Sequence, residues 1–73
     1  MAETNSPAKD DIVQQFETMK GFELSARNLY MQIAASAHIR PAEIKTAFKS
    51  LADDEQRHAD LAQEIIDIIT DAL

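Results

Sequence analysis

The sequence predicts an all-α protein, in which two long helices form an antiparallel hairpin and two hairpins associate into a four-helix bundle. Two long segments each carry apolar residues at alternating steps of four and three, which is the spacing of helices that pack on other helices. A proline separates the two segments, and no third periodic segment follows. A chain of 73 residues without cysteine buries a modest core, so we expect association to complete it.

The first helix is expected over about residues 7–38, after a disordered tail at residues 1–5. Ser6 is a suitable N-cap and Pro7 suits the first helical position, and two aspartates follow in the opening turns, where the helix dipole favours negative charge. The apolar seam of this helix comprises Ile12, Phe16, Met19, Ala26, Tyr30, Ile33 and Ala37, and Glu23 alone interrupts it.

The second helix is expected over about residues 41–71, so that residues 6–73 form a single domain. Pro41 disfavours helical geometry at the residue before it and is well suited to a first helical position. The short connection makes the helices antiparallel neighbours. The second seam comprises Ile44, Phe48, Leu51, Ala62, Ile65 and Ile69, with Glu55 and His58 as polar breaks. Leu61, Ile66 and Ile68 widen this apolar face beyond what one neighbouring helix covers.

Composition and charge disfavour several classes of function. The absence of cysteine removes zinc-ribbon, rubredoxin and thiol-redox sites. A net charge of −6, with seven scattered lysines and arginines, argues against nucleic acid as a partner. No apolar run approaches the roughly 18 residues of a membrane span, and the polar N-terminus does not resemble a signal peptide. We therefore expect a soluble cytoplasmic protein, or one inside a protein compartment, and no membrane partner.

The three polar breaks are predicted to lie at one level of the hairpin. Glu23 precedes the turn by about sixteen residues, and Glu55 and His58 follow it by about fifteen to eighteen. At about 1.5 Å per residue, all three lie roughly 24 Å from the turn. Glu55 and His58 are three residues apart and leave one face of their helix. A two-fold dimer would gather four glutamates and two histidines in one layer.

Carboxylates in an apolar core either take up protons or bind cations. Two divalent metals would balance the four glutamates, and a sulfur-free donor set suits iron or manganese, although zinc binds such sites too. We therefore predict that Glu23, Glu55 and His58 bind metal. Two alternatives remain open: a hydrogen-bonded carboxylate–imidazole pair without metal, and a mononuclear site within one hairpin.

Other residues near the predicted site have candidate roles. Tyr30 lies two turns from Glu23 on the same face, and its ring should lean toward the site. It is therefore a candidate catalytic residue, and the alternative is a core tyrosine beside Phe48 and Leu51. Gly21 lowers helix stability by about 1 kcal/mol and suggests close packing or a bend near the site. The candidates for orienting the ligands are Arg27, Asn28, Asp54 and Arg57.

Two stretches carry a family resemblance. Residues 23–30, ELSARNLY, resemble the rubrerythrin pattern E-x-x-A-R-N-x-Y. Residues 52–59, ADDEQRHA, resemble its A-D-E-E-x-x-H-A, with Asp54 in place of the first glutamate. Over about residues 12–70 the chain thus resembles the rubrerythrin-like branch of the ferritin-like superfamily. In its two-helix form it is similar to encapsulated ferritins, in which two chains complete one di-iron site.

The resemblance implies a ferritin-like four-helix bundle of two chains, with a di-iron site at the homodimer interface and manganese or zinc as substitutes for iron. It implies ferroxidase activity, in which Fe(II) is oxidised to Fe(III) with O₂ or H₂O₂ for iron storage or detoxification. Rubrerythrin-like peroxide reduction, metal binding or iron delivery without catalysis, and a purely structural assembly are the alternatives. The implied partners include a higher homo-oligomer and an encapsulin-type shell, although neither a targeting tail nor the rubredoxin cysteines are seen. The catalytic residues would be Glu23, Glu55, His58 and Tyr30.

Overall fold

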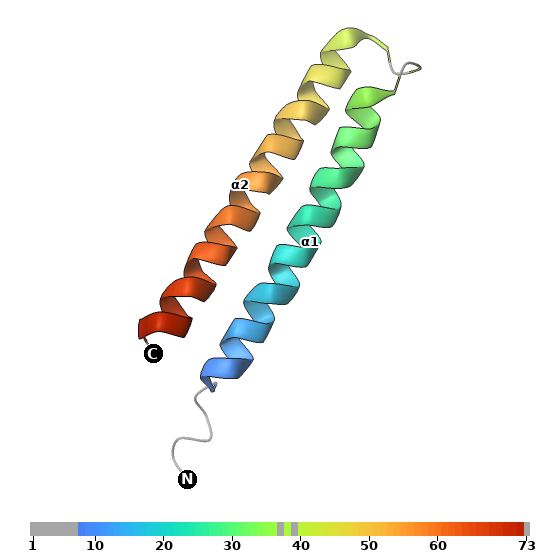
Figure 1. The fold of residues 1–73 in the computed structure, drawn as a ribbon. Helices are drawn as coiled ribbons and strands as arrows, with labels where there is room; N and C mark the ends of the chain where they lie inside the picture. The colour runs from blue at the N-terminus through green and yellow to red at the C-terminus, as the bar shows by residue number, and fades with distance from the viewer. Residues whose placement is uncertain (1–7, 37, 39, 73) are drawn as a thin grey trace.

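The computed structural model describes residues 8–36, 38 and 40–72. It contains two α-helices, α1 (Lys9–Ala35) and α2 (Ala42–Ala72), and the described residues form no strand. The helices lie side by side and antiparallel, with the turn at one end and the start of α1 and the end of α2 at the other (Figure 1). The predicted all-α hairpin is confirmed. Neither helix combines the length and the apolar character needed to cross a membrane.

Helix α1 begins later and ends earlier than the sequence predicts. Ala8 precedes it with extended backbone and caps it without a side-chain hydrogen bond, although its carbonyl accepts from the amide of Ile12 at 3.1 Å. Ser6 and Pro7, and the predicted tail at residues 1–5, lie outside the described residues. The helix therefore starts where two aspartates enter its first turn and stabilise the positive end of the helix dipole.

Hydrogen bonds are present at both ends of the connection between the helices. Backbone at Ser36 is extended, so α1 ends there rather than near residue 38, and the Ser36 hydroxyl accepts from the amide of His38 at 3.2 Å. Pro41 lies directly before α2, and its carbonyl accepts from the amide of Ile44 at 3.0 Å. Proline therefore precedes the first helical residue instead of occupying that position, a shift of one residue.

The core between the helices differs from the predicted seam of α2. The buried side chains are Ala52, Ala59, Ala62 and Ile66, and three of these four are alanines that allow α1 to approach closely. Leu51 and Ile65, which the sequence placed in the seam, are 42% and 37% exposed. Ala62 of the predicted seam is buried, and Phe48 and Ile69 are half-buried. The stripe of Ile44, Leu51 and Ile65 is exposed, and the stripe one residue later replaces it in the core, because two adjacent stripes of α2 are both apolar at heptad spacing.

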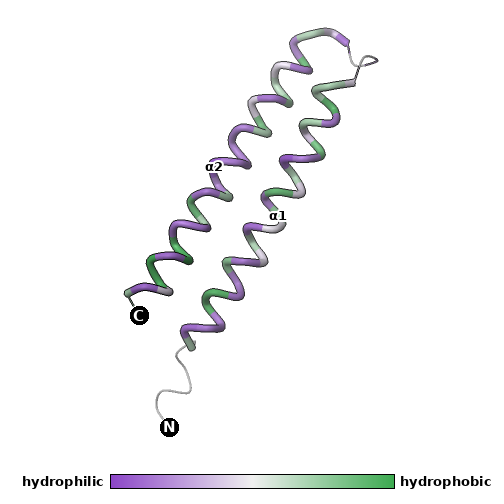
Figure 2. The backbone as a smooth tube through the Cα atoms, in the orientation of Figure 1, coloured by the Kyte–Doolittle hydropathy of each residue, from purple (hydrophilic) through white to green (hydrophobic). Residues whose placement is uncertain are grey.

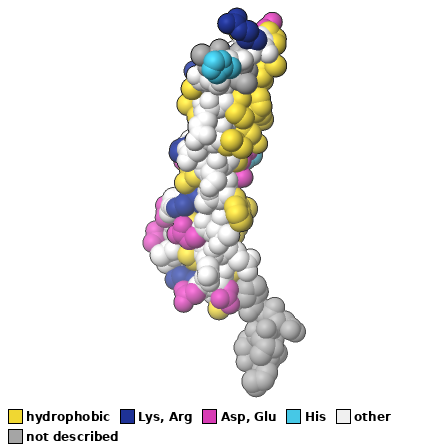
Figure 3. Space-filling model, turned by 90° about the vertical axis from the view of Figure 1, so that its right-hand side faces the viewer, with side chains coloured by type: hydrophobic (Ala, Val, Ile, Leu, Met, Phe, Trp, Pro, Cys, Tyr) yellow, Lys and Arg dark blue, Asp and Glu magenta, His cyan; other side chains and the backbone are white. Residues whose placement is uncertain are grey.

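A second stripe of apolar side chains remains open on the hairpin. Figure 2 shows hydrophobic and hydrophilic positions alternating along both helices, and in Figure 3 hydrophobic side chains gather along one edge near the turn. Helical spacing places eight exposed large residues on one side of the hairpin, a surface that single monomers rarely expose. This apolar face comprises Met19, Phe22, Leu29, Ile44, Leu51, Leu61, Ile65 and Ile68.

Gly21 has no close neighbour in the hairpin. A Cβ atom built on it would meet nothing within 4 Å, so the predicted close packing at this position is wrong within one hairpin. We expect Gly21→Ala to raise the free energy of unfolding by about 1 kcal/mol, because alanine restricts the unfolded chain and favours the helix. Urea denaturation would measure the gain. Ser25→Ala, at another exposed α1 position, is the control with a smaller gain, and a loss of stability in Gly21→Ala would contradict the prediction.

Candidate metal centre

Three side chains from the two helices converge near the middle of the hairpin. Nδ1 of His58 lies 2.9 Å from Oε2 of Glu23 and 3.7 Å from Oε1 of Glu55. One ligand atom from each residue lies within 4.8 Å of the others. The structure thus brings together the residues that the sequence singled out, and their binding of a metal stays a prediction.

The convergence follows from the hairpin itself. All three residues lie about four helical turns from the connection, on helices that run antiparallel, so they reach the same level. Glu55 and His58 are three residues apart in α2 and leave the same face of that helix. Small buried residues beside them, Ala59 and Ala62, keep the backbone of α1 near enough for Glu23 to reach His58.

The site opens on one side of the hairpin. The side chains of Glu23 and Glu55 are 24% and 19% exposed, whereas that of His58 is 52% exposed. Glu23 and His58 share a groove of about 220 Å³ with apolar neighbours. A metal held here would therefore lie partly between the helices and partly at the apolar face. The remaining lining residues are Phe16, Met19, Leu61, Ala62 and Ile65.

The surroundings of Glu55 disfavour its negative charge. Burial raises the pKa of Glu55 above its ordinary value of 4.5, and the hydrogen bond and charge repulsion with Glu23 raise it further. The carboxylate of Asp54 adds to this shift, whereas His58 opposes it. A cation bound between the two carboxylates would relieve this repulsion.

We expect the stability of the metal-free protein to depend on the protonation of Glu55. Because its pKa is raised on folding, its contribution to stability is complete below the unfolded value and is lost as pH rises through the folded value. Glu55→Gln keeps the neutral form at every pH, so its melting temperature should exceed that of the wild type by a margin that grows upward from about pH 4.5. Thermal unfolding in chelator would measure this margin. Glu64→Gln, at an exposed position, should show no such trend, and an equal trend in both variants would contradict the assignment.

Tyr30 takes part in the packing between the helices. Its ring packs against that of Phe48, with ring centroids 5.8 Å apart and planes tilted by 45°. The core packing considered for Tyr30 is therefore present, and its catalytic role stays a prediction.

The four residues expected to orient the ligands pair elsewhere. Arg57 binds Asp54 three residues before it, and Arg27 donates to Asn28 and to Gln56. In the described part of the chain none of the four makes a hydrogen bond or ion pair with a ligand side chain, although the charge of Asp54 contributes to the raised pKa of Glu55. Sequence reasoning missed Gln56 and, one heptad later, Gln63, which bridge the helices.

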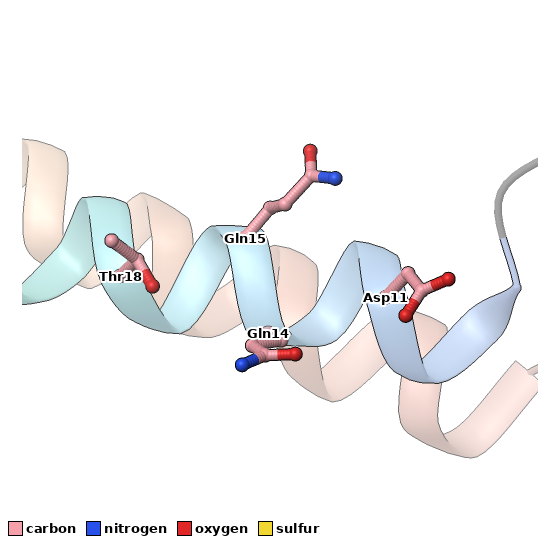
Figure 4. A pocket seen from close by; sticks show the side chains of 4 residues that line it. All are labelled: Asp11, Gln14, Gln15 and Thr18. Atoms are coloured by element: carbon pink, nitrogen blue, oxygen red, sulfur yellow. The ribbon is translucent and has the colours of Figure 1, made fainter.

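A hollow near the start of α1 does not form a second site. All four lining side chains come from that one helix, and they point in different directions instead of toward one another (Figure 4). Within the described residues the only group of three or more potential metal ligands is therefore the one at His58. The residues of this hollow are Asp11, Gln14, Gln15 and Thr18.

A helical hairpin with two carboxylates and an imidazole converging between its helices is the arrangement of ferritin-like metal proteins. The family model for rubrerythrin matches residues 21–72, a span that contains all three converging residues. The chain therefore belongs to the rubrerythrin family, whose members are ferritin-like and typically bind iron. Comparisons with curated proteins and with solved structures gave no match.

Proposed function

We propose that two copies of the chain form a four-helix bundle that binds two iron ions and acts as a ferroxidase, oxidising Fe(II) with O₂ or H₂O₂. The observation that supports this most is the convergence of Glu23, Glu55 and His58 within 4.8 Å beside an open apolar groove. The family assignment supports iron as the metal.

A site shared between two chains would have the donor set of known di-iron bundles. One chain offers three ligand residues, two carboxylates and one imidazole. Two chains would offer four carboxylates and two imidazoles for two ions, and the four negative charges would balance two divalent cations. This donor set is the one found in di-iron carboxylate bundles.

The distribution of charge favours an antiparallel arrangement of the two hairpins. Beyond the site toward the termini, the described residues include two lysines and seven acidic residues, and in Figure 3 acidic side chains gather at that end. Toward the turn, four basic residues accompany three acidic ones. A two-fold axis perpendicular to the helices would place each acidic half beside the less acidic half of the other copy, whereas a parallel dimer would place the acidic halves together. The seven acidic residues are Asp10, Asp11, Glu17, Asp60, Glu64, Asp67 and Asp71.

The same arrangement would close the groove beside the site. The groove lies on the terminal side of Glu23 and His58, so an antiparallel copy would face it with its own turn half. Leu29 and Leu51 of that half are 53% and 42% exposed, and their insertion would bury apolar surface on both chains. Closure would also remove water from the metal ligands.

The three converging residues of each chain would bind the metal ions and balance their positive charge. Glu55 would bind a cation as its carboxylate, and the positive charge would offset the surroundings that raise the pKa of this group in the hairpin. His58 would offer Nδ1, the nitrogen that faces both carboxylates. As the substrate, Fe(II) would supply one electron per ion, so that oxidation of two ions would reduce O₂ to H₂O₂, or H₂O₂ to water, with the uptake of two protons. The apolar groove would keep other reductants and bulk water from the site.

Oxidation of added iron tests the proposal. Fe²⁺ mixed anaerobically with the protein and then exposed to air should develop the near-ultraviolet absorption of bound Fe(III) faster than free Fe²⁺ does, with about one iron per chain. Magnetic coupling between the irons would distinguish a dinuclear from a mononuclear site. Faster reaction with H₂O₂ that depends on an external reductant would favour peroxide reduction. Tight binding of Fe²⁺ without faster oxidation would indicate a protein that delivers iron. A melting temperature that does not change when iron is added would indicate a structural role.

A further inference from the structure

Two polar bridges of the same kind cross from α1 to α2, and each consists of a basic residue, a glutamine and an aspartate. In the first, Nη1 of Arg27 donates to Oε1 of Gln56, and Nε2 of Gln56 donates to Asp60 at 3.0 Å. The contact between the helices is partly buried. A basic residue on α1 is thus joined to an aspartate on α2 through a neutral amide.

The second bridge repeats the first one heptad away. Nζ of Lys20 donates to Oε1 of Gln63 at 2.6 Å, and Nε2 of Gln63 donates to Asp67 at 2.8 Å. Each member lies seven residues from its counterpart. The two bridges therefore lie on opposite sides of the level at which Glu23 meets His58.

Glutamine is the side chain that suits this position. Its amide accepts from the cation with one end and donates to the aspartate with the other, so both polar ends are satisfied. Glutamate would accept from the cation but would repel an aspartate four residues later in the helix. The bridges also lie apart from the metal groove, because Arg27 and Gln56 line a hollow that shares no residue with it.

The axial register of the two helices rests on polar as well as apolar contacts. Three of the four buried core residues are alanines, and the one aromatic contact between the helices in the described residues, Tyr30 on Phe48, lies toward the turn. A shift of α1 by one turn, about 5.4 Å, would move Glu23 away from Glu55 and His58. The same shift would break both bridges.

We propose that Gln56 and Gln63, held by Arg27 and Lys20, are positioning residues that set the register of α1 on α2 and so assemble the three metal ligands before metal arrives. The expected effect on metal affinity rests on the proposed function, but the register of the helices can be measured without metal. Replacing Arg27 with a residue that has no hydrogen-bond donor is the sharpest test. Replacement by lysine is the conservative control, because Lys20 makes the equivalent contact in the second bridge.

Two measurements on full-length variants test the proposal. Co²⁺ titration, followed by visible absorption, reports affinity and ligand geometry, and nuclear Overhauser contacts between His58 and Glu23 report the register of the metal-free protein. Arg27→Met should weaken Co²⁺ binding about tenfold, change the visible bands and weaken these contacts. Arg27→Lys should retain all three properties, and Lys49→Met, at an exposed position, controls for the lost charge.

The outcomes separate this inference from the proposed function. Equal Co²⁺ affinity, bands and contacts in Arg27→Met and Lys49→Met would overturn the positioning role. A lower melting temperature of Arg27→Met with unchanged affinity and bands would overturn it too, because the bridge would then be structural only. A wild-type protein that shows the His58 contacts but binds no Co²⁺ would overturn the proposed metal function, while loss of the contacts in Arg27→Met would still support the register role.

Discussion

Glu55→Gln should abolish the response of the protein to iron and leave the hairpin folded. The amide has nearly the shape of the carboxyl group but cannot supply an anionic ligand. Since burial and Glu23 already raise the pKa of Glu55, a neutral side chain is well tolerated in the metal-free state. Loss of a direct ligand should weaken metal binding by more than about 100-fold, beyond the cost of removing a residue that only supports a ligand.

Two measurements would check this expectation. Anaerobic Fe²⁺ should raise the melting temperature of the wild type, because a ligand that binds only the folded state stabilises it, and should leave that of Glu55→Gln unchanged. On exposure to air, iron oxidation with the variant should fall to the rate of free Fe²⁺. Glu64→Gln removes an exposed carboxylate from the same helix and should behave as the wild type. A variant at Glu55 that kept both responses would exclude this residue as a ligand.

Leu61→Glu should dissociate the dimer and, with it, the metal site. Leu61 is 51% exposed in the hairpin and lines the groove beside His58, so its replacement leaves the contact between α1 and α2 intact. In the proposed dimer the new carboxylate would lie in an apolar interface near four glutamates. Because each Leu61 is half-exposed in the hairpin, its burial in the dimer contributes about 1 kcal/mol. The two copies together lose about 2 kcal/mol, which alone raises the dissociation constant by roughly 30-fold.

Sedimentation at several protein concentrations would measure the change in association, with iron titration on the same samples. Gln32→Glu adds the same charge at an exposed α1 position outside the apolar face, and it should remain dimeric and bind metal. If Leu61→Glu were monomeric and bound iron as tightly as the wild type, the site would lie within one hairpin. A wild type that is monomeric in the presence of iron would contradict the dimer directly.

The sequence alone was sufficient for the hairpin and for the level of the candidate site. Apolar spacing of four and three defines two helices, and Pro41 separates them. The spacing of Glu55 and His58 places both on one helical face, and the distance of Glu23 from the turn places it at the same height. These inferences succeed because helical rise and periodicity are nearly constant, so separation along the chain converts directly into position in space.

The tertiary structure decided which faces meet and which polar groups pair. Heptad spacing left two adjacent stripes of α2 as candidates for the core, and the small size of Ala52 and Ala59, which permits close approach of α1, selected one of them. The partner of Arg27 proved to be Gln56 rather than a ligand carboxylate. The rotation of a helix about its axis, and the partners that long polar side chains can reach, depend on the distance between the two helix backbones. The spacing of apolar residues in the sequence does not specify that distance.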